Sequence, residues 1–248
     1  MNLFDFGRKK ASPDNEVHTI SLDKPSVKEE MSTATYTPGG QVRTVDGTLR
    51  PPWAMRSDLE RDYFDEEWGR HIITESGLLE RIALEGFQSG LSWSTVLRKR
   101  RAFREVFSLF DATRIAQMTE EQKREALADE RLIRNQQKQA AVYTNAEATI
   151  ALRDDPDLQA LPEGHPAEKV LGGVVKRLPA GLPVLIWSFT PAEHERPRHI
   201  DDIKSTSPES KAMSTELKRR GFSFVGPTTC YALMQAIGMV DDRVDEED

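Results

Sequence analysis

Two short stretches of this chain hold its most chemically useful residues. They are Leu84-Glu85-Gly86-Phe87-Gln88-Ser89-Gly90-Leu91-Ser92-Trp93 and Tyr63-Phe64-Asp65-Glu66-Glu67-Trp68-Gly69. A carboxylate such as Glu85 accepts hydrogen bonds from an amino group and attracts positive charge. The rings of Tyr63, Trp68 and Trp93 offer faces on which a flat ring stacks, and those faces also attract cations. If the fold brings the two stretches together, they suit a polar, cationic ring such as a modified nucleobase.

A helix must position Glu85. Leu78, Ile82, Glu85 and Ser89 follow one another at helical spacing, so the carboxylate shares a stripe with apolar residues. Burial of a carboxylate is costly unless it is paired or hydrogen-bonded. Two interpretations stay open from the residues alone: a structural glutamate that meets an arginine or caps a neighbouring helix, or a carboxylate that reads a bound base. The aromatic residues are equally consistent with an ordinary core, and we expect Trp53 to belong to it.

The rest of the chain from Pro51 onward also favours helices. We expect helices over about 92–109, over 132–152 with a break near Asn135, from Ser207-Pro208 to Gly221, and over 228–240. Thr119-Glu120-Glu121-Gln122 is typical of a capping box that opens a further short helix. Residues 154–182 are expected to form a surface loop. Because no stretch alternates convincingly between apolar and polar residues, the predicted fold class is all-α.

Residues 1–47 differ in composition from the rest. They are rich in Ser, Thr, Pro and charged residues and lack a sustained apolar period, so we expect a disordered N-terminal tail followed by one helical domain over 48–248. Leu3-Phe4-Asp5-Phe6 is the one segment of this tail that could serve as a short docking peptide.

Composition excludes several classes of protein. The net charge of −7 argues against bulk attraction to nucleic acid, although Arg98–Arg101 and Lys218–Arg220 could form local basic faces. The one cysteine, Cys230, excludes an intrachain disulfide and favours a cytoplasmic location. No apolar run approaches the ~18 residues that span a bilayer. We expect a monomer that does not associate with membranes and needs no cofactor.

Several separate blocks resemble one family. Asp65–Gly69, Leu84–Trp93, Arg219–Tyr231 and Met234–Val240 look like the signature blocks of DNA-3-methyladenine glycosylase I, in the order and at the spacings of that family. The resemblance covers about Pro51 to Val244. It implies a helix-hairpin-helix fold and an enzyme of base-excision repair that flips out 3-methyladenine and hydrolyses its N-glycosidic bond. The implied partner is double-stranded DNA that contains alkylated bases.

The resemblance also implies roles for single residues. The base-recognising and catalytic carboxylate falls on Glu85, the stacking tryptophan on Trp93, and the other pocket residues on Tyr63 and Trp68. Candidate contacts to DNA phosphates come from the hairpin, with Arg134 and Lys138, and from the basic run, with Lys218, Arg219 and Arg220.

Three departures from the family pattern matter. The family's zinc ligands fall on Pro51, Phe64, Arg243 and Glu247, none of which is Cys or His, so we expect no metal and expect apolar packing or an ion pair of Arg243 to hold the chain ends.

The second departure is Gln137, which stands where a hairpin glycine is expected, so the turn must adopt a different backbone conformation or bear strain at positive φ. The third is Ala232, which replaces a frequent serine. Two alternatives therefore stay open: a non-catalytic module that binds damaged DNA or another ligand, and a glycosylase whose lesion preference Phe87 and Ala232 have shifted.

Overall fold

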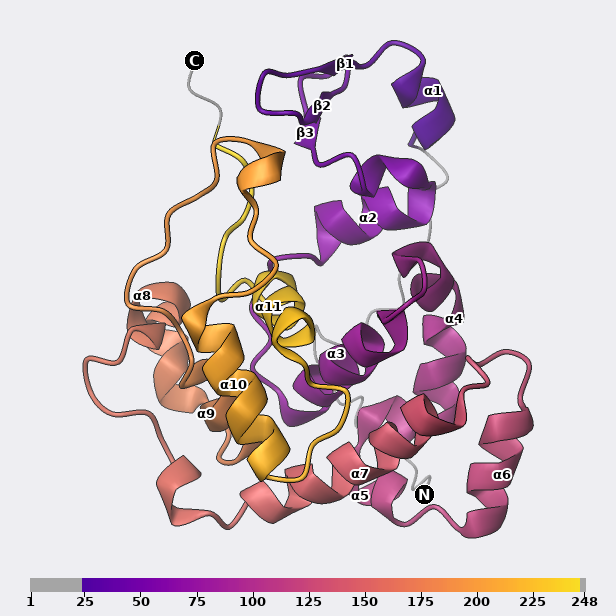
Figure 1. Ribbon diagram of the computed structural model, residues 1–248, viewed down its shortest axis with the longest axis vertical. Coiled ribbons are helices and arrows are strands. Elements are labelled where there is room, and N and C mark those ends of the chain that lie inside the picture. The colour runs from indigo at the N-terminus through magenta and orange to yellow at the C-terminus, as the bar shows by residue number, and fades with distance from the viewer. Residues whose placement is uncertain (1–23, 246–248) are drawn as a thin grey trace, which may run out of the picture.

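The computed structural model describes residues 24–245, and helices dominate this part of the chain (Figure 1). The all-α prediction is confirmed for the main body, with one small sheet added near the N-terminus. In chain order the elements are α1 (Val27–Met31), β1 (Thr35–Tyr36), β2 (Val42–Arg43), β3 (Leu49–Arg50), η2 (Ala54–Arg56), α2 (Asp58–Glu66), α3 (Glu75–Gln88), α4 (Trp93–Val106), η3 (Ser108–Phe110), α5 (Ala112–Ala116), α6 (Glu120–Ala128), α7 (Gln136–Leu152), η4 (Pro156–Leu158), α8 (Ala167–Leu171), η5 (Gly172–Arg177), α9 (Leu182–Trp187), η6 (Ile200–Asp202), α10 (Pro208–Arg219) and α11 (Pro227–Ala236).

Helix α3 lies at the centre of the fold. It contacts α4, α7, α9 and α11, and its residues from Leu78 to Phe87 are buried (Figure 1). The Phe87 ring stacks on Phe103 of α4 at 4.4 Å between ring centroids. The indole of the buried Trp187 on α9 donates to the Ile72 carbonyl, 3.0 Å away, just before α3 begins. The helix that carries Glu85 is therefore fixed on several sides.

Local capping signals set the helix starts. Ser92 caps α4 through the Thr95 amide, and Thr119 and Gln122 form the expected capping box of α6. Asn135 caps α7, which explains the expected break at that residue. The expected loop over 154–182 was wrong in part, because η4, α8 and η5 lie within it.

The strain expected at Gln137 is absent. Gln137 is the second residue of α7, whose backbone is helical throughout, and it is not among the described residues with positive φ. The residue at this position therefore needs no left-handed conformation, and the glutamine does not distort the hairpin between α6 and α7.

Residues 24–50 form what we call the N-terminal lobe, and the expectation of a disordered tail up to residue 47 needs correction over this range. The lobe contains α1 and the antiparallel sheet β1–β2–β3, in which Val42 pairs with Arg50. Only three residues form its buried apolar cluster, Val27, Val42 and Met55. Residues 1–23, including Leu3–Phe6, lie outside the described range.

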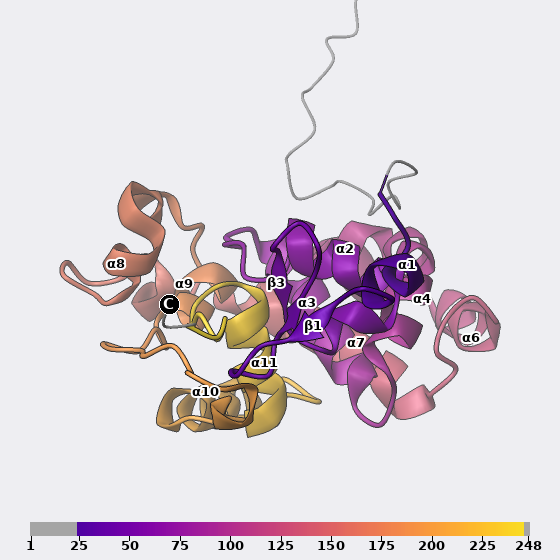
Figure 2. The ribbon, with the colours of Figure 1, turned by 90° about the horizontal axis from the view of Figure 1, so that it is seen from above.

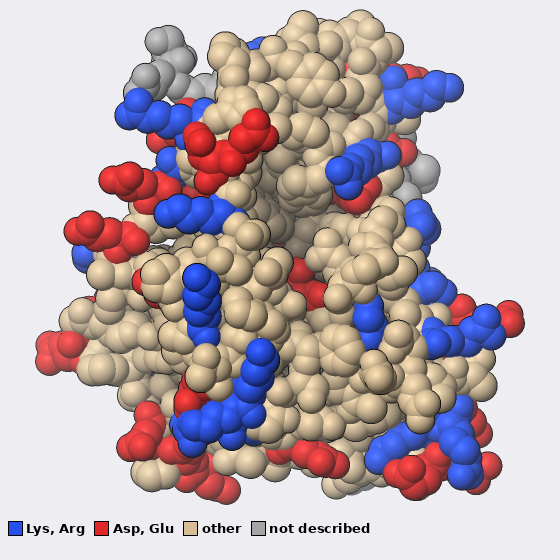
Figure 3. Space-filling view, in the orientation of Figure 1, with Lys and Arg blue, Asp and Glu red and all other residues tan. Residues whose placement is uncertain are grey.

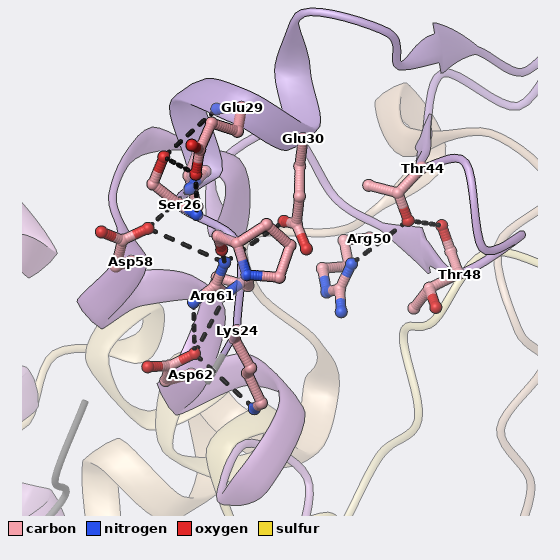
Figure 4. A network of polar contacts seen from close by, with 12 residues as sticks. Lys24, Ser26, Glu29, Glu30, Thr44, Thr48, Arg50, Asp58, Arg61 and Asp62 are labelled. Carbon is pink, nitrogen blue, oxygen red and sulfur yellow. Dashed lines mark hydrogen bonds and ion pairs between the residues drawn. The ribbon is translucent and has the colours of Figure 1, made fainter. Parts of the chain in front are cut away.

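A network of charged groups attaches the lobe to α2 (Figure 4). The Arg61 guanidinium is almost fully buried; it donates to the Pro25 carbonyl and to the fully buried Asp62, and lies 3.4 Å from Glu30. The Val27 amide donates to the Asp58 carboxylate at 2.6 Å. The small apolar cluster buries little surface, so polar contacts provide much of the stabilisation of the lobe. For this reason the apolar pattern of the sequence did not reveal it.

The N-terminal lobe also meets the C-terminal end of the described chain. The Gln41 side-chain amide donates to the Val244 carbonyl at 3.3 Å, and the Ile200 amide donates to the Gly39 carbonyl at 2.9 Å. Seen from above, the strands of the lobe cover the middle of the molecule (Figure 2). The lobe thus spans from α2 to the segments that follow α9 and α11.

The buried charge of Arg61 gives the first test. Arg61→Met should lower the free energy of unfolding by about 3 kcal/mol, because it leaves Asp62 buried without its guanidinium partner. Arg101→Met is the matched control, since Arg101 has a 79% exposed side chain and pairs with Glu105 on the surface; its loss should cost less than about 0.5 kcal/mol. Urea denaturation measures both, and equal effects would mean that the buried network does not stabilise the lobe.

Candidate base-binding site

A cavity of about 580 Å³ opens between the N-terminal lobe and the central helices. On the face of Figure 3, the surface is hollowed between the lobe with α2 on one side and α3 with α11 on the other. The four residues expected to form the site, Tyr63, Trp68, Glu85 and Trp93, all line this cavity. The structure thus brings together side chains from α2, the loop after it, α3 and the start of α4.

Glu85 is buried near the C-terminal end of α3 and lines the cavity. Within residues 24–245 its carboxylate accepts no hydrogen bond. Burial raises the pKa of Glu85 to about 7, and Arg81, one turn earlier on α3, opposes the shift. A buried carboxylate without a hydrogen-bond donor can gain much from a ligand that brings a donor or a positive charge. The structural alternative left open by the sequence, a glutamate that caps a helix, is not what the geometry shows.

The arginines around Glu85 are occupied by other acids. Arg81 contacts Glu67 and donates to the Tyr63 hydroxyl at 3.1 Å, and Arg100 donates to Glu67 at 2.8 Å. Glu80 accepts from Arg100 and from Arg104, both at 2.7 Å. Arg81 thus contacts Glu67 and Tyr63, while its buried Nε has no hydrogen-bond partner among the described residues. The Glu85 carboxylate is consequently influenced by a cation without forming a hydrogen-bonded pair with it.

The aromatic side chains line one side of the cavity, and their ring planes are tilted relative to one another. The rings of Tyr63 and Trp93 lie 5.2 Å apart at 59°, so a base cannot enter between them and would stack on one ring beside the edge of the other. The Trp93 indole nitrogen is buried without a hydrogen-bond partner in the described part of the chain. Trp53, expected to be core, also lines the cavity, 6.4 Å from Tyr63 and 6.0 Å from Trp68.

Other cavity residues were missed or misjudged from the sequence. Glu60 is buried and lines the cavity, and it accepts a hydrogen bond from the Ser57 hydroxyl; the Ser57-Asp58-Leu59-Glu60 capping pattern was the available signal. Leu91 lies on the same wall, is 41% exposed, and follows Gly90 in the turn between α3 and α4. Phe87 does not line the cavity, since it stacks in the core, whereas Ala232 does line it.

The five cations expected to contact DNA differ in availability. Lys138 is buried and donates to the Phe87 and Ser89 carbonyls at the end of α3, so its ammonium group is not free to bind a phosphate. Arg219 and Arg220 both pair with Glu216, and Arg220 also pairs with Asp155. Lys218 is exposed, and the exposed Arg134 lies 3.5 Å from Glu130.

Three of the four positions that correspond to the family's zinc ligands meet at this cavity. Pro51, Phe64 and Arg243 all line it, whereas Glu247 lies outside the described range. The Arg243 guanidinium lies 5.2 Å from the Trp68 ring centre and 5.6 Å from that of Phe64, and it donates to the Trp68 carbonyl at 2.9 Å. These side chains offer no zinc-binding atoms, and stacking on a cation takes their place. Within the described residues, no cluster of three or more potential metal ligands occurs.

A helical fold that gathers a buried carboxylate and several aromatic rings around one open cavity defines a protein built to hold a small aromatic ring. Similarity to known proteins shows to which family this protein belongs. The family model for methyladenine glycosylase matches residues 53–163 and 174–246. The chain therefore belongs to the methyladenine glycosylase family, and the N-terminal lobe precedes the part that the family model matches.

Named relatives agree with this assignment. The DNA-3-methyladenine glycosylase of Haemophilus influenzae is 36% identical over 80% of this chain and 96% of its own length. DNA-3-methyladenine glycosylase 1 of Escherichia coli is 34% identical over 77% and 91%. A crystal structure of 3-methyladenine DNA glycosylase I shares the fold with a TM-score of 0.64 and 34% identity, over 76% of this chain and 92% of that chain. The enzyme from Staphylococcus aureus, at 22% identity, shows the same fold with a TM-score of 0.64.

The buried carboxylate should cost stability at neutral pH. The pKa of Glu85 rises from 4.5 to about 7 on folding, so the folded state binds more protons between these values and stability falls as the pH rises through them. Glu85→Gln removes this penalty, which amounts to at most about 3 kcal/mol.

Urea denaturation at pH 5.5 and pH 8 tests this directly. The stability advantage of Glu85→Gln over the parent should grow toward pH 8, and Glu147→Gln, at an exposed position of α7, should show no such trend. A Glu85→Gln variant less stable than the parent at pH 8 would show that Glu85 is a structural partner instead.

The purified protein should contain no stoichiometric zinc, because three of the corresponding positions hold Pro51, Phe64 and Arg243. Its melting temperature should be unchanged by a strong chelator, since no metal-binding free energy is linked to folding. Elemental analysis that finds about one zinc per chain, retained after the chelator, would contradict this.

Proposed function

We propose that this protein hydrolyses the N-glycosidic bond of 3-methyladenine in alkylated double-stranded DNA; its relatives are named DNA-3-methyladenine glycosylases. The observation that carries the proposal is the Glu85 carboxylate, buried without a hydrogen-bond donor on the wall of an aromatic cavity. A base inside a duplex is inaccessible, so the enzyme must first flip the nucleotide out of the stack. The alkylated base in DNA carries a positive charge, which matches the charge and the ring faces of the cavity.

Glu85 would act on the flipped base through charge and hydrogen bonding. A cation that enters the cavity favours the ionised carboxylate, so the pKa of Glu85 falls on binding. The carboxylate accepts a hydrogen bond from the amino group of the base, while Trp93 stacks on the ring and Tyr63 borders its edge. The site holds the lesion out of the duplex, and unmodified neutral adenine gains less from the same contacts.

The chemical step needs little from the protein. When the bond between C1′ and the base breaks, its electron pair moves to the base, which leaves neutral, and positive charge passes to the sugar. Water then adds to C1′ and loses a proton, which completes the hydrolysis. Because the base is already a good leaving group, its orientation and the negative charge of Glu85, which favours developing positive charge, can supply much of the acceleration.

Contacts to DNA around the lesion are assigned by availability. Lys218, near the C-terminal end of α10, and Arg134, in the α6–α7 connection, are both exposed. Arg219 and Arg220 pair with Glu216 and must release it in part before they bind a phosphate. Leu91, exposed beside the cavity, is placed to fill the gap that a flipped base leaves in the stack.

We favour the enzyme over the alternatives raised by the sequence. The case for a non-catalytic module depended on replacement of the hairpin glycine by Gln137, which lies in an ordinary helical turn. The case for a shifted lesion preference depended on Phe87 and Ala232. Phe87 faces the core, so only Ala232, which lines the cavity, still supports that case. We also propose that the protein acts as a cytoplasmic monomer. Among the described helices, none has the length and apolar character needed to cross a membrane.

Glu85→Gln should reduce single-turnover release of 3-methyladenine from methylated DNA at least tenfold. The substitution keeps the volume but removes the charge and turns a donor amide toward the amino group of the base, a mismatch worth roughly 1–3 kcal/mol. Trp93→Ala should reduce release comparably through lost stacking, worth about 1–3 kcal/mol. Chromatography of the free base measures the rate.

The matched control is Glu147→Gln, which makes the same substitution on the surface and should excise at the parent rate. Excision by Glu85→Gln at the parent rate would end the assignment of Glu85 to the base. Absence of any released base from the parent protein would end the proposed function itself.

A further inference from the structure

Two cations line the cavity in the described part of the chain, and they differ in their surroundings. Arg243 is engaged by the Trp68 carbonyl, by Asp241 and by two aromatic rings. Arg56 is exposed and has no hydrogen bond or ion pair to any residue between 24 and 245. Glu60, one turn along α2, is bound by the Ser57 hydroxyl and forms no ion pair with Arg56.

A free guanidinium on this wall needs an explanation. The proposed function, on which this inference rests, brings a cationic base into the cavity. The carboxylates of Glu60, Glu85 and Asp242, which line the cavity, favour that cation, whereas the guanidinium of Arg56 does not. An exposed guanidinium at the rim of the cavity suits an anion that arrives together with the base. A flipped nucleotide supplies one, because its phosphate stays at the cavity opening once the base has entered.

We propose that Arg56 binds the backbone phosphate of the flipped nucleotide and so positions its base against Glu85. The planar guanidinium suits two phosphate oxygens at once. Of the other candidate cations, Lys218 and Arg134 are exposed but do not line the cavity, Arg219 and Arg220 are paired, and Lys138 is buried. Arg56 is therefore the free cation beside the cavity itself.

The backbone below Arg56 is held in place. Ala54 and Met55, the other residues of η2, are buried, and their amides donate to the Pro51 and Pro52 carbonyls at 3.0 and 3.2 Å. Met55 joins the small apolar cluster of the N-terminal lobe. The lobe, which precedes the part matched by the family model, thus supports the rim of the cavity at Arg56.

The test compares Arg56→Gln and Arg56→Lys with Arg114→Gln. Arg114 is likewise exposed and free of ion pairs among the described residues, but lies on α5, at the opposite end of the molecule from the lobe (Figure 1). Affinity for a duplex with a stable abasic-site analogue is measured at several salt concentrations. Affinity for free 3-methyladenine is measured by fluorescence of the cavity tryptophans.

Arg56→Gln should weaken binding to the duplex about tenfold and reduce the slope of log K against log salt by about one, with affinity for the free base within about twofold of the parent. Arg56→Lys should restore most of the slope because it keeps the charge, and Arg114→Gln should match the parent. If Arg56→Gln binds the duplex as Arg114→Gln does, or loses affinity for the free base as much as for the duplex, the proposal is wrong. If the parent protein releases 3-methyladenine from methylated DNA while either of these results is found, the inference on Arg56 has failed and the proposed function stands.

Discussion

The base-binding site depends on keeping one carboxylate buried, ionisable and without a hydrogen-bond donor of its own. Glu85 meets this demand because the arginines near it are directed elsewhere: Arg81 contacts Glu67 and Tyr63, and Arg100 bridges Glu67 and Glu80. If Arg81 formed a hydrogen-bonded pair with Glu85, the carboxylate would be satisfied before any base arrived. If no cation stood nearby, the pKa of Glu85 would be higher still, because Arg81 lowers it. The alternating chain of charges holds Glu85 between these limits, and a cationic ligand completes its pairing.

The aromatic wall depends on contacts between distant parts of the chain. Gly238 follows α11 at φ +68°, and a side chain there would collide with the Gly69 carbonyl, next to Trp68. The Gly69 amide in turn donates to the Ala236 carbonyl at 3.0 Å. This close approach fixes the backbone of Trp68 against α11, while Arg243 covers its ring. The C-terminal segment therefore positions the wall of the cavity from the side opposite α3.

The sequence predicted what local rules determine. The helix starts at Ser92, Thr119 and Ser207 follow from capping patterns within three residues, and the position of Glu85 on a buried stripe follows from helical spacing. Lys138 was misjudged because its role depends on carbonyls some fifty residues earlier, at the end of α3, which no local pattern reveals.

The N-terminal lobe was missed for a related reason. Its strands have two residues each, too short to show alternation, and it is attached by ion pairs of Arg61 with partners on either side. Composition alone resembled that of a disordered segment, since hydrophobic burial is only a small part of what orders these residues. Polar contacts of this kind become visible only when α1 and α2 are placed side by side.

The positions that correspond to the family's zinc ligands and the contacts of the lobe involve the same two parts of the chain, α2 and the C-terminal segment. A metal site joins chain ends through a few strong bonds and needs little surface. With Phe64 and Arg243 at two of those positions, the ends are joined by a guanidinium stacked on rings, an interaction worth only about 0.5–2 kcal/mol. Gln41 adds a hydrogen bond from the lobe to the Val244 carbonyl, and the lobe is itself anchored on α2 through Arg50 and Asp65 at 2.7 Å. Several weak contacts spread over a larger interface can thus hold α2 and the C-terminal segment on the two sides of the cavity, where Tyr63 and Trp68 must stay in register with Glu85.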